Sequence, residues 1–309
     1  MRAFFIFLSL FLLSLGAQAT GAPRIVVSIL PLHSIVAAVM GDIGVPTLLL
    51  PGRLGEHRAS FSPQQIAEIV DADAVFLVSP GLEAKLSQMS GSETIGGKSF
   101  VFLGEAPGVA RLAVREGGSW SGHHHDEEEG EDREEEGILA YDPHVWLDPE
   151  NAKAMARAIA SELAELDAAN ATSYAANSKR FAASLDSLSA EIAQALTPLR
   201  EKRFVVFHDA FQYFEKRFAL HGAGSIADVS AAPPSAKRLN DIKRMIAEDG
   251  VVCVFREPQY DDRYVRTAIE DGGARPGVLD PIGAGLEPGA GAYGLLLTKL
   301  ADDFAACMR

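Results

Sequence analysis

The segment "NATSYAANSKRFAASLDSLSAEIAQALTPLR", residues 170–200, predicts one long helix in the middle of the chain. About 28 helical residues make a rod of roughly 40 Å. A preceding helix is expected to start after Asp148, a natural N-cap, with Pro149 in its first position. The alternative is two ordinary helices with a break between them. The apolar residues recur at helical spacing, with no helix breaker before Pro198: Tyr174, Phe181, Leu185, Leu188, Ile192, Leu196 and Leu199.

On both sides of this helix, short runs of β-branched and apolar residues alternate with amphipathic segments, a pattern typical of α/β layering. We therefore predict an α/β fold of two (β/α) lobes with central sheets, joined by a single long, rigid α-helix. The predicted domains are 20–160, 161–200 for the linking helix, and 201–309. The expected strands are 24–30, 46–50, 74–78 and 99–103 in the first half, and 203–207, 225–229, 251–255 and 277–280 in the second.

Residues 1–19, "MRAFFIFLSLFLLSLGAQA", have the pattern of a cleaved signal peptide. Arg2 supplies the positive end, an apolar core runs from Ala3 to Leu15, and the final Ala-Gln-Ala fits cleavage after small residues. The alternative, a membrane anchor, needs about 20 apolar residues, more than this run offers. No other segment is apolar enough to span a membrane. We expect an exported, soluble protein whose mature chain begins near Thr20 or Gly21.

Residues 117–137 contain a run in which His123, His124 and His125 precede a dense set of acidic residues. Such a composition cannot bury a core, so it predicts a mobile, solvated loop. This run holds more than half of the formal net charge of −14, and the rest of the protein is only mildly acidic. Nucleic-acid binding needs basic patches, so a nucleic-acid partner is excluded.

The chain has two cysteines, Cys253 in "VVCVF" and Cys307 near the C-terminus. In an exported protein an even pair favours a disulfide. Two buried free thiols are the alternative. A thiolate metal site is disfavoured because no second cysteine pair is present to complete it.

Four polar residues stand where a strand or loop passes into the next element. They are His57 in a Gly-rich loop, His144 in "YDPHVWLDPE", His208 at the end of "RFVVF", and Asp280 at the end of "GVLD". Ligands of α/β sheets bind at the carboxyl ends of strands. Three imidazoles and one carboxylate form a four-coordinate set that suits Zn²⁺. Each histidine taken alone is more often structural, and spacing alone does not decide between these interpretations.

Longer motifs carry a resemblance that covers nearly the whole mature chain. They are "GEH" followed by "SFSPQQ", "DPHVWLDPENA", "FVVFHDAFQYFEKRF", "VVCVFREPQ" and "LDPIG". With these motifs the sequence resembles the ZnuA-type family, the periplasmic zinc-binding components of bacterial ABC transporters for zinc uptake. The family also has a His/acid-rich loop at the position of 121–137, and its zinc members have a cysteine pair where Cys253 and Cys307 stand.

The resemblance implies that His57, His144 and His208 bind zinc in the cleft between the lobes. For the fourth position it offers Asp280, which we favour as the nearby carboxylate, or else Glu56 or a water molecule. Arg256 and Glu257 are either a pair that orients a ligand imidazole or a plain ion pair. The three histidines of the acidic run either capture zinc weakly as an accessory loop or belong to a solvated charge run.

The expected function is capture of Zn²⁺ in the periplasm and delivery to a membrane permease driven by an ATPase, with zinc as cargo and no catalysis. We expect a monomer. Manganese-binding relatives have a carboxylate where His208 stands, and an imidazole shifts the preference toward zinc. One alternative is the same fold serving manganese or another divalent metal. A zinc hydrolase is a further alternative, but the chain lacks an H-E-x-x-H motif and offers only Glu56 as an obvious base.

Overall fold

Two parallel four-stranded sheets form the frame of the protein in the computed structural model, which describes residues 21–50, 57, 60–91, 99–115, 120 and 139–309. The predicted signal peptide, Glu56 and the three histidines at 123–125 lie outside these residues. Within the described part of the chain, no helix is long and apolar enough to cross a membrane.

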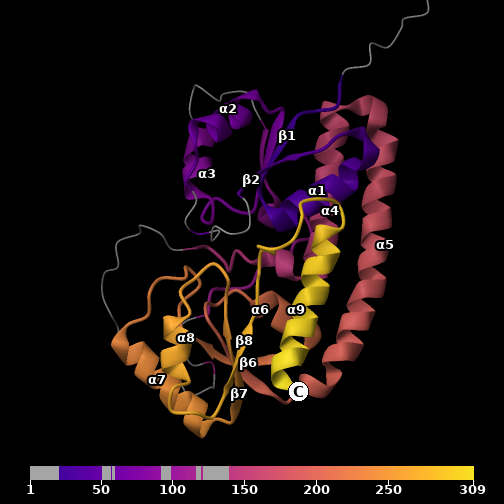
Figure 1. The fold of residues 1–309 in the computed structure, drawn as a ribbon. Helices are drawn as coiled ribbons and strands as arrows, with labels where there is room; N and C mark the ends of the chain where they lie inside the picture. The colour runs from indigo at the N-terminus through magenta and orange to yellow at the C-terminus, as the bar shows by residue number, and fades with distance from the viewer. Residues whose placement is uncertain (1–20, 51–56, 58–59, 92–98, 116–119, 121–138) are drawn as a thin grey trace, which may run out of the picture.

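The N-terminal lobe contains the first sheet, with strand order β2-β1-β3-β4 (Figure 1). Its strands are β1 (Ile25–Ile29), β2 (Thr47–Leu50), β3 (Ala74–Leu77) and β4 (Ser99–Phe102), and its helices are α1 (Leu30–Met40), α2 (Pro63–Asp71) and α3 (Ala84–Ser90). The central strands β1 and β3 are buried along their whole length, as expected for parallel strands covered on both faces. All four strands lie within the predicted ranges.

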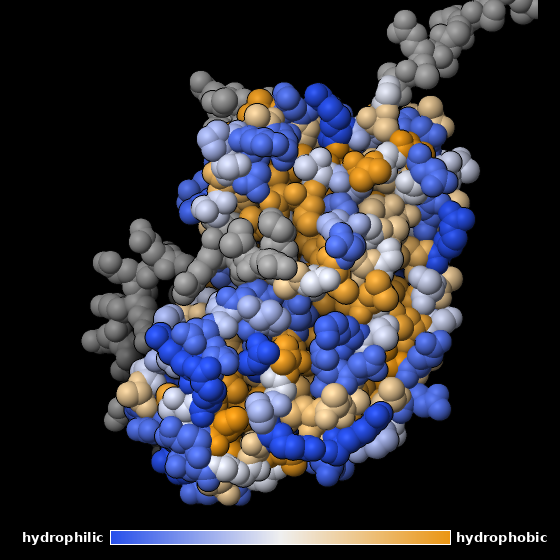
Figure 2. All heavy atoms as spheres, viewed as in Figure 1, coloured by the Kyte–Doolittle hydropathy of each residue, from blue (hydrophilic) through white to orange (hydrophobic). Residues whose placement is uncertain are grey.

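The C-terminal lobe repeats this arrangement with strand order β6-β5-β7-β8. Its strands are β5 (Arg203–Val206), β6 (His221–Ser225), β7 (Val251–Arg256) and β8 (Arg275–Val278), and its helices are α6 (Gln212–Phe218), α7 (Ala236–Glu248), α8 (Arg263–Ala268) and α9 (Ala292–Met308). The surface over α7 and α8 is largely hydrophilic (Figure 2), while Ile242, Met245 and Ile246 of α7 are buried. The α/β fold of two lobes is thus confirmed.

Two strands are displaced from their predicted positions: β8 (Arg275–Val278) begins two residues before the expected range of 277–280, and β6 is shifted further. We expected residues 225–229, but β6 is His221–Ser225, with the sequence HGAGS. This strand is at the edge of its sheet and pairs with β5 alone. Its glycines lack the β-branched side chains on which the prediction relied, so tertiary pairing overrides local propensity here.

Two helices follow one another in the sequence between the two sheets. Helix α4 (Pro149–Leu166) begins as predicted, with Pro149 in its first turn and the Asp148 side chain accepting a hydrogen bond from the Glu150 N–H at 2.9 Å. Helix α5 (Ala171–Leu196) follows after a short 3₁₀ turn and extends along both lobes (Figure 1). Short 3₁₀ helices also occur at Gly41–Ile43, Leu103–Glu105, Val145–Leu147, Ala168–Asn170 and Thr197–Leu199.

Helix α5 packs against α1 in the N-terminal lobe and against α9 in the C-terminal lobe. The side chain of Asn177 donates to Val39 O at 2.9 Å, and Phe181 packs on Tyr293 with 5.8 Å between ring centres. Its inward residues are the apolar ones that predicted the helix: Tyr174, Phe181, Leu185, Ile192 and Leu196 are buried. A long helix therefore joins the lobes, whereas the domain boundaries at 160/161 and 200/201 stay predictions.

Cys253 and Cys307 form a disulfide, with their Cα atoms 6.0 Å apart. It joins β7 to the end of α9 across 54 residues of sequence. The predicted bridge is thus present, and a loop of this length contributes about 4 kcal/mol in the chain-entropy model.

Candidate metal centre

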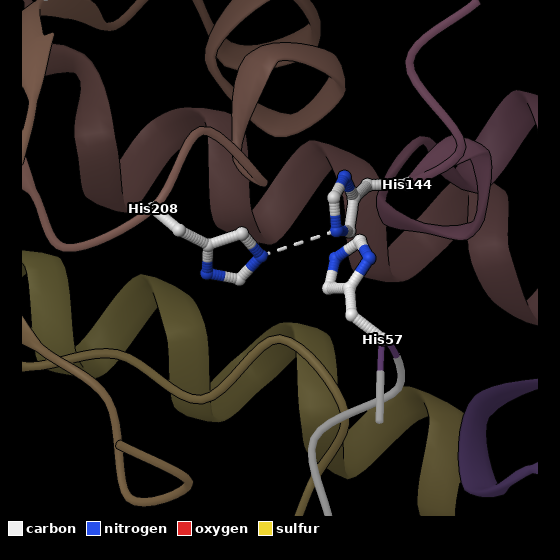
Figure 3. A group of neighbouring side chains, drawn as sticks. All are labelled: His57, His144 and His208. Atoms are coloured by element: carbon white, nitrogen blue, oxygen red, sulfur yellow. Dashed lines mark hydrogen bonds between the residues drawn. The ribbon is translucent and has the colours of Figure 1, made fainter. Parts of the chain in front are cut away.

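Three histidines from distant parts of the sequence meet between the two lobes. His57 comes after β2, His144 lies just before the 3₁₀ helix Val145–Leu147, and His208 follows β5. Their ring centres are 5.1 to 5.6 Å apart, and the rings point toward one another (Figure 3). Each offers one ring nitrogen, and these nitrogens all lie within 4.8 Å of one another. The fold therefore brings together the three predicted imidazoles.

His208 lies at the topological switch point of the C-terminal sheet. The chain leaves β5 and β7, the two central strands, in opposite directions, and ligands of open α/β sheets bind where the strand order reverses. His208 follows β5 and Glu257 follows β7 directly. The Glu257 Oε1 atom accepts hydrogen bonds from His208 Nδ1 at 2.7 Å and from the His208 backbone N–H at 3.1 Å. The hypothesis that Glu257 orients a ligand imidazole fits this geometry.

His144 is held in the same way by Asp142. The Asp142 Oδ1 atom accepts from the His144 ring Nδ1 at 2.8 Å and from its backbone N–H at 3.0 Å. Sequence reasoning did not identify this residue, although the signal lay inside the motif "YDPHVW". An aspartate two residues before a residue can accept from that residue's backbone N–H, and here the same oxygen also meets the ring.

These carboxylates determine which ring nitrogen is available to a metal. A carboxylate accepts hydrogen bonds, so Nδ1 of each imidazole carries the proton and Nε2 presents its lone pair. The two Nε2 atoms lie 3.2 Å apart. Two nitrogens bound to one tetrahedral zinc at about 2.0–2.1 Å would be about 3.3–3.4 Å apart. The pair is therefore already spaced as metal ligands, and both side chains are fully buried.

Trp146 fixes the backbone beside His144. Its ring centre is 5.2 Å from that of His144, and its Nε1–H donates to Pro281 O at 2.8 Å. The hydroxyl of Tyr293 donates to Trp146 O at 2.6 Å. These two bonds tie the His144 segment to elements of the C-terminal half, so the imidazole has little freedom to move.

Asp280, the predicted fourth ligand, accepts hydrogen bonds from a side-chain amide and from backbone N–H groups. Its Oδ1 atom accepts from Gln259 Nε2 at 2.8 Å and from the backbone N–H groups of Ile282 and Gly283. Its Oδ2 atom accepts from the Ala284 N–H at 2.6 Å. Among the described residues, its carboxylate is not part of the group of ligand atoms within 4.8 Å. The fourth ligand stays a prediction, with Glu56 and the loop histidines outside the described residues.

Two other described histidines lie away from this group. His33 is buried in α1, and its Nε2 is 3.0 Å from the carbonyl oxygen of Pro46, which as an acceptor requires the proton on Nε2. Burial lowers the pKa of His33, opposed by that hydrogen bond. His221 is exposed at the start of β6.

Comparison with known proteins identifies the family. The family model "Zinc-uptake complex component A periplasmic" matches residues 25–307. The chain belongs to this family. A high-affinity zinc uptake system protein ZnuA from Brucella abortus (strain 2308) is 39% identical over 317 residues, covering 96% of this chain and 93% of that protein. The corresponding ZnuA of Paracoccus denitrificans is 35% identical, covering 96% of each chain.

Solved structures agree with this assignment. A crystal structure of ZnuA superimposes with a TM-score of 0.77 at 28% identity, covering 93% of this chain and 100% of that chain. A ZnuA deletion mutant with zinc bound gives a TM-score of 0.72 at 28% identity, covering 93% of this chain and 98% of that chain. The laminin-binding protein Lbp of Streptococcus pyogenes has the same fold, with a TM-score of 0.74 at 26% identity. The resemblance found in the sequence motifs is thereby confirmed.

Proposed function

We propose that this protein captures Zn²⁺ in the bacterial periplasm and delivers it to a membrane permease powered by an ATPase. One observation carries the proposal: the Nε2 atoms of His144 and His208 face each other 3.2 Å apart, and the Nδ1 atom of each ring contacts a carboxylate. The relatives are named zinc uptake proteins, and the family description is periplasmic. The predicted signal peptide at residues 1–19 would direct the chain to that compartment.

The proposed ligands are His57, His144 and His208, with Asp280, Glu56 or a water molecule in the fourth position. Asp280 Oδ2 accepts a hydrogen bond from the Ala284 N–H, and its second lone pair is the one that would bind zinc. Asp280→Asn and Glu56→Gln separate the three possibilities. Loss of a coordinating carboxylate weakens zinc binding strongly, whereas both variants bind like the wild type when the fourth ligand is water.

Zinc is the proposed cargo because the site supplies three nitrogen donors. Imidazole suits zinc, whereas manganese prefers carboxylate, carbonyl and water oxygens. The usual order of divalent affinities also places Zn²⁺ well above Mn²⁺. A His208→Asp variant exchanges one nitrogen for an oxygen donor, so its ratio of zinc to manganese affinity should fall.

The deciding experiment is a competition titration of the chelator-stripped mature protein with zinc and manganese. It compares the wild type with a variant lacking residues 121–136 and with His208→Ala. The proposal expects one tight zinc in the wild type, the same tight zinc in the deletion variant, and its loss in His208→Ala. If the deletion abolishes tight binding, the acidic run is the principal site and the ligand assignment is wrong.

Zinc carried as cargo is bound and released without any chemical step at the site. A screen of the zinc-loaded protein against ester, peptide and phosphate substrates tests this directly. Sustained turnover that disappears in His208→Ala would contradict the transport proposal and support a hydrolase instead. Absence of turnover together with tight, reversible zinc binding supports the proposal.

A further inference from the structure

A charged cluster next to the zinc ligands ties the loop of His208 to the N-terminal lobe. Arg115 Nε donates to both carboxylate oxygens of Asp209 at 3.0 Å, and its Nη1 donates to Glu215 Oε2 at 2.8 Å. The side chains of Asp209 and Glu215 are 4% and 6% exposed, and that of Arg115 is 20% exposed. Two buried carboxylates side by side destabilise the folded protein unless a cation neutralises their charge. Arg115 supplies that cation.

The two carboxylates lie on the segment that directly follows His208. Asp209 is the residue after His208, and Glu215 lies in α6, which follows the same loop. The chain that leads to Arg115 also contacts the loop of the second ligand: the Asp142 backbone N–H donates to Leu112 O at 2.9 Å. One stretch of chain thus touches the support of both buried ligand histidines.

Trp120 extends this contact to the edge of the C-terminal sheet. The guanidinium carbon of Arg115 lies 3.3 Å from the centre of the Trp120 ring, which is a cation–π contact. The Trp120 backbone N–H donates to Ala223 O of the edge strand β6 at 2.9 Å. A Cβ atom on Gly222 would stand 2.6 Å from Trp120 Cζ3, so only glycine lets the indole lie this close to the strand.

Arg115 and Trp120 together form what we name the Arg115–Trp120 anchor. In the sequence, the His/acid-rich run of residues 121–137 begins directly after Trp120. The anchor therefore links Trp120, the residue just before that run, to the loop that contains His208. None of these contacts is needed to complete a ligand set, since neither Arg115 nor Trp120 can coordinate a cation.

We propose that the Arg115–Trp120 anchor positions His208 for zinc and is in turn stabilised by zinc at His208. The inference rests on the proposed function, because His208 must bind zinc for the two to be linked. Coupling between two sites is reciprocal: if docking of the anchor favours zinc, zinc favours docking of the anchor to the same extent. Trp120 is thus held more firmly in the zinc-bound protein than in the zinc-free protein.

Zinc affinity of the full mature chain, measured by competition with a chromophoric chelator, tests the first half of this coupling. Arg115→Gln should weaken tight zinc binding about tenfold or more, as loss of groups that orient metal ligands typically does. Arg115→Lys keeps the charge but lacks the planar guanidinium group. Its zinc affinity should therefore lie between those of the wild type and Arg115→Gln. Arg217→Gln is the matched control, since Arg217 makes a comparable two-bond contact with Asp148. It should bind zinc like the wild type.

Hydrogen exchange of the Trp120 backbone amide tests the second half of the coupling, the stabilisation of the anchor by zinc, in the unmodified protein. Zinc should slow exchange of this amide in the wild type but not in Arg115→Gln, with the amides of β4 as internal reference. A merely structural role of Arg115 would lower stability without making Trp120 protection depend on zinc. This readout decides the matter even if Arg115→Gln folds poorly.

The inference is overturned if Arg115→Gln binds zinc within about twofold of the wild type, well below the loss expected when such groups are removed. It is equally overturned if zinc leaves Trp120 exchange unchanged in the wild type. Either result leaves the zinc site itself intact. Failure of the wild type to bind zinc tightly would instead contradict the proposed function, so the two failures are distinguishable.

Discussion

Replacing Glu257 by glutamine isolates the contribution of a single charge to zinc binding. Glutamine has nearly the same size, and its carbonyl oxygen can still accept a hydrogen bond from His208 Nδ1, where the glutamate accepts at 2.7 Å. The imidazole keeps its proton on Nδ1 and its lone pair on Nε2. What the variant loses is the negative charge behind a ring that becomes more positive when zinc binds.

The expected loss follows from the strengths of charged and neutral hydrogen bonds. Hydrogen bonds to charged groups contribute about 1.5–3 kcal/mol, against about 1 kcal/mol for neutral ones. Glu257 Oε1 also accepts a hydrogen bond from the His208 backbone N–H. Weakening of that bond destabilises the zinc-free and the zinc-bound protein alike, so this part does not change the zinc affinity. The two strengths differ by about 0.5–2 kcal/mol, so we expect a loss in zinc binding at the lower end of the 10- to 100-fold range typical of such partners, about tenfold or 1.4 kcal/mol.

Chelator competition at neutral pH measures this loss, and the absorption spectrum of the cobalt-loaded protein reports whether the site stays tetrahedral. Asp142→Asn makes the same change at His144 and should weaken binding in the same range. Glu150→Gln is the matched control, because this exposed carboxylate bonds to Lys153 and supports no ligand. A zinc affinity of Glu257→Gln within about twofold of the wild type would refute the role assigned to its charge, since the expected loss is about tenfold.

Three further predictions address the scaffold. Burial lowers the pKa of His33, so the folded protein favours the neutral imidazole. The contribution of His33 to stability is therefore present above the unfolded pKa near 6.5 and is lost as the pH falls below it. His33→Gln should reduce the fall in melting temperature between pH 7 and 5. Gly222→Ala pushes a Cβ atom against Trp120 and Glu215, so it should cost about 1–3 kcal/mol in chemical unfolding, whereas Gly285→Ala, with open space around it, should cost little. Since α5 packs on both lobes, small-angle scattering should show almost the same radius of gyration with and without zinc; a clear contraction would contradict a stiff connection.

Most of the fold could be predicted from the sequence because its strands are continuous apolar runs. Parallel strands covered on both faces need such runs, and those of both sheets stand out, except at β8, which is RPGV, and at β6. There the strand is HGAGS, and its place is set by pairing with β5 and by the close approach of Trp120 to Gly222. Neither contact has a local signature, so a prediction from propensity moved the strand toward the more apolar residues that follow.

The positions of the three histidines were predictable for a topological reason, whereas their supports were not. A residue that directly follows a parallel strand lies at the carboxyl end of the sheet, where ligands bind in α/β folds. The position of His208 after β5 therefore predicted its place in the site. Which carboxylate would meet its Nδ1 atom depends on the pairing of β5 with β7, across 49 residues of sequence. Asp142 is close in sequence to His144, but many aspartates precede a histidine without contacting its ring.

The two carboxylates also explain which form of the paired imidazoles faces the shared centre. Imidazoles at this distance would repel each other if both were protonated at Nε2, and burial disfavours the doubly protonated, charged form. Asp142 and Glu257 direct each proton to the outer nitrogen, away from the shared centre, while their negative charge favours an incoming cation. The structure thus separates two tasks: the segments after β2 and β5 and the one before Val145–Leu147 place the three imidazoles, and the acids behind His144 and His208 leave their Nε2 atoms available to a metal.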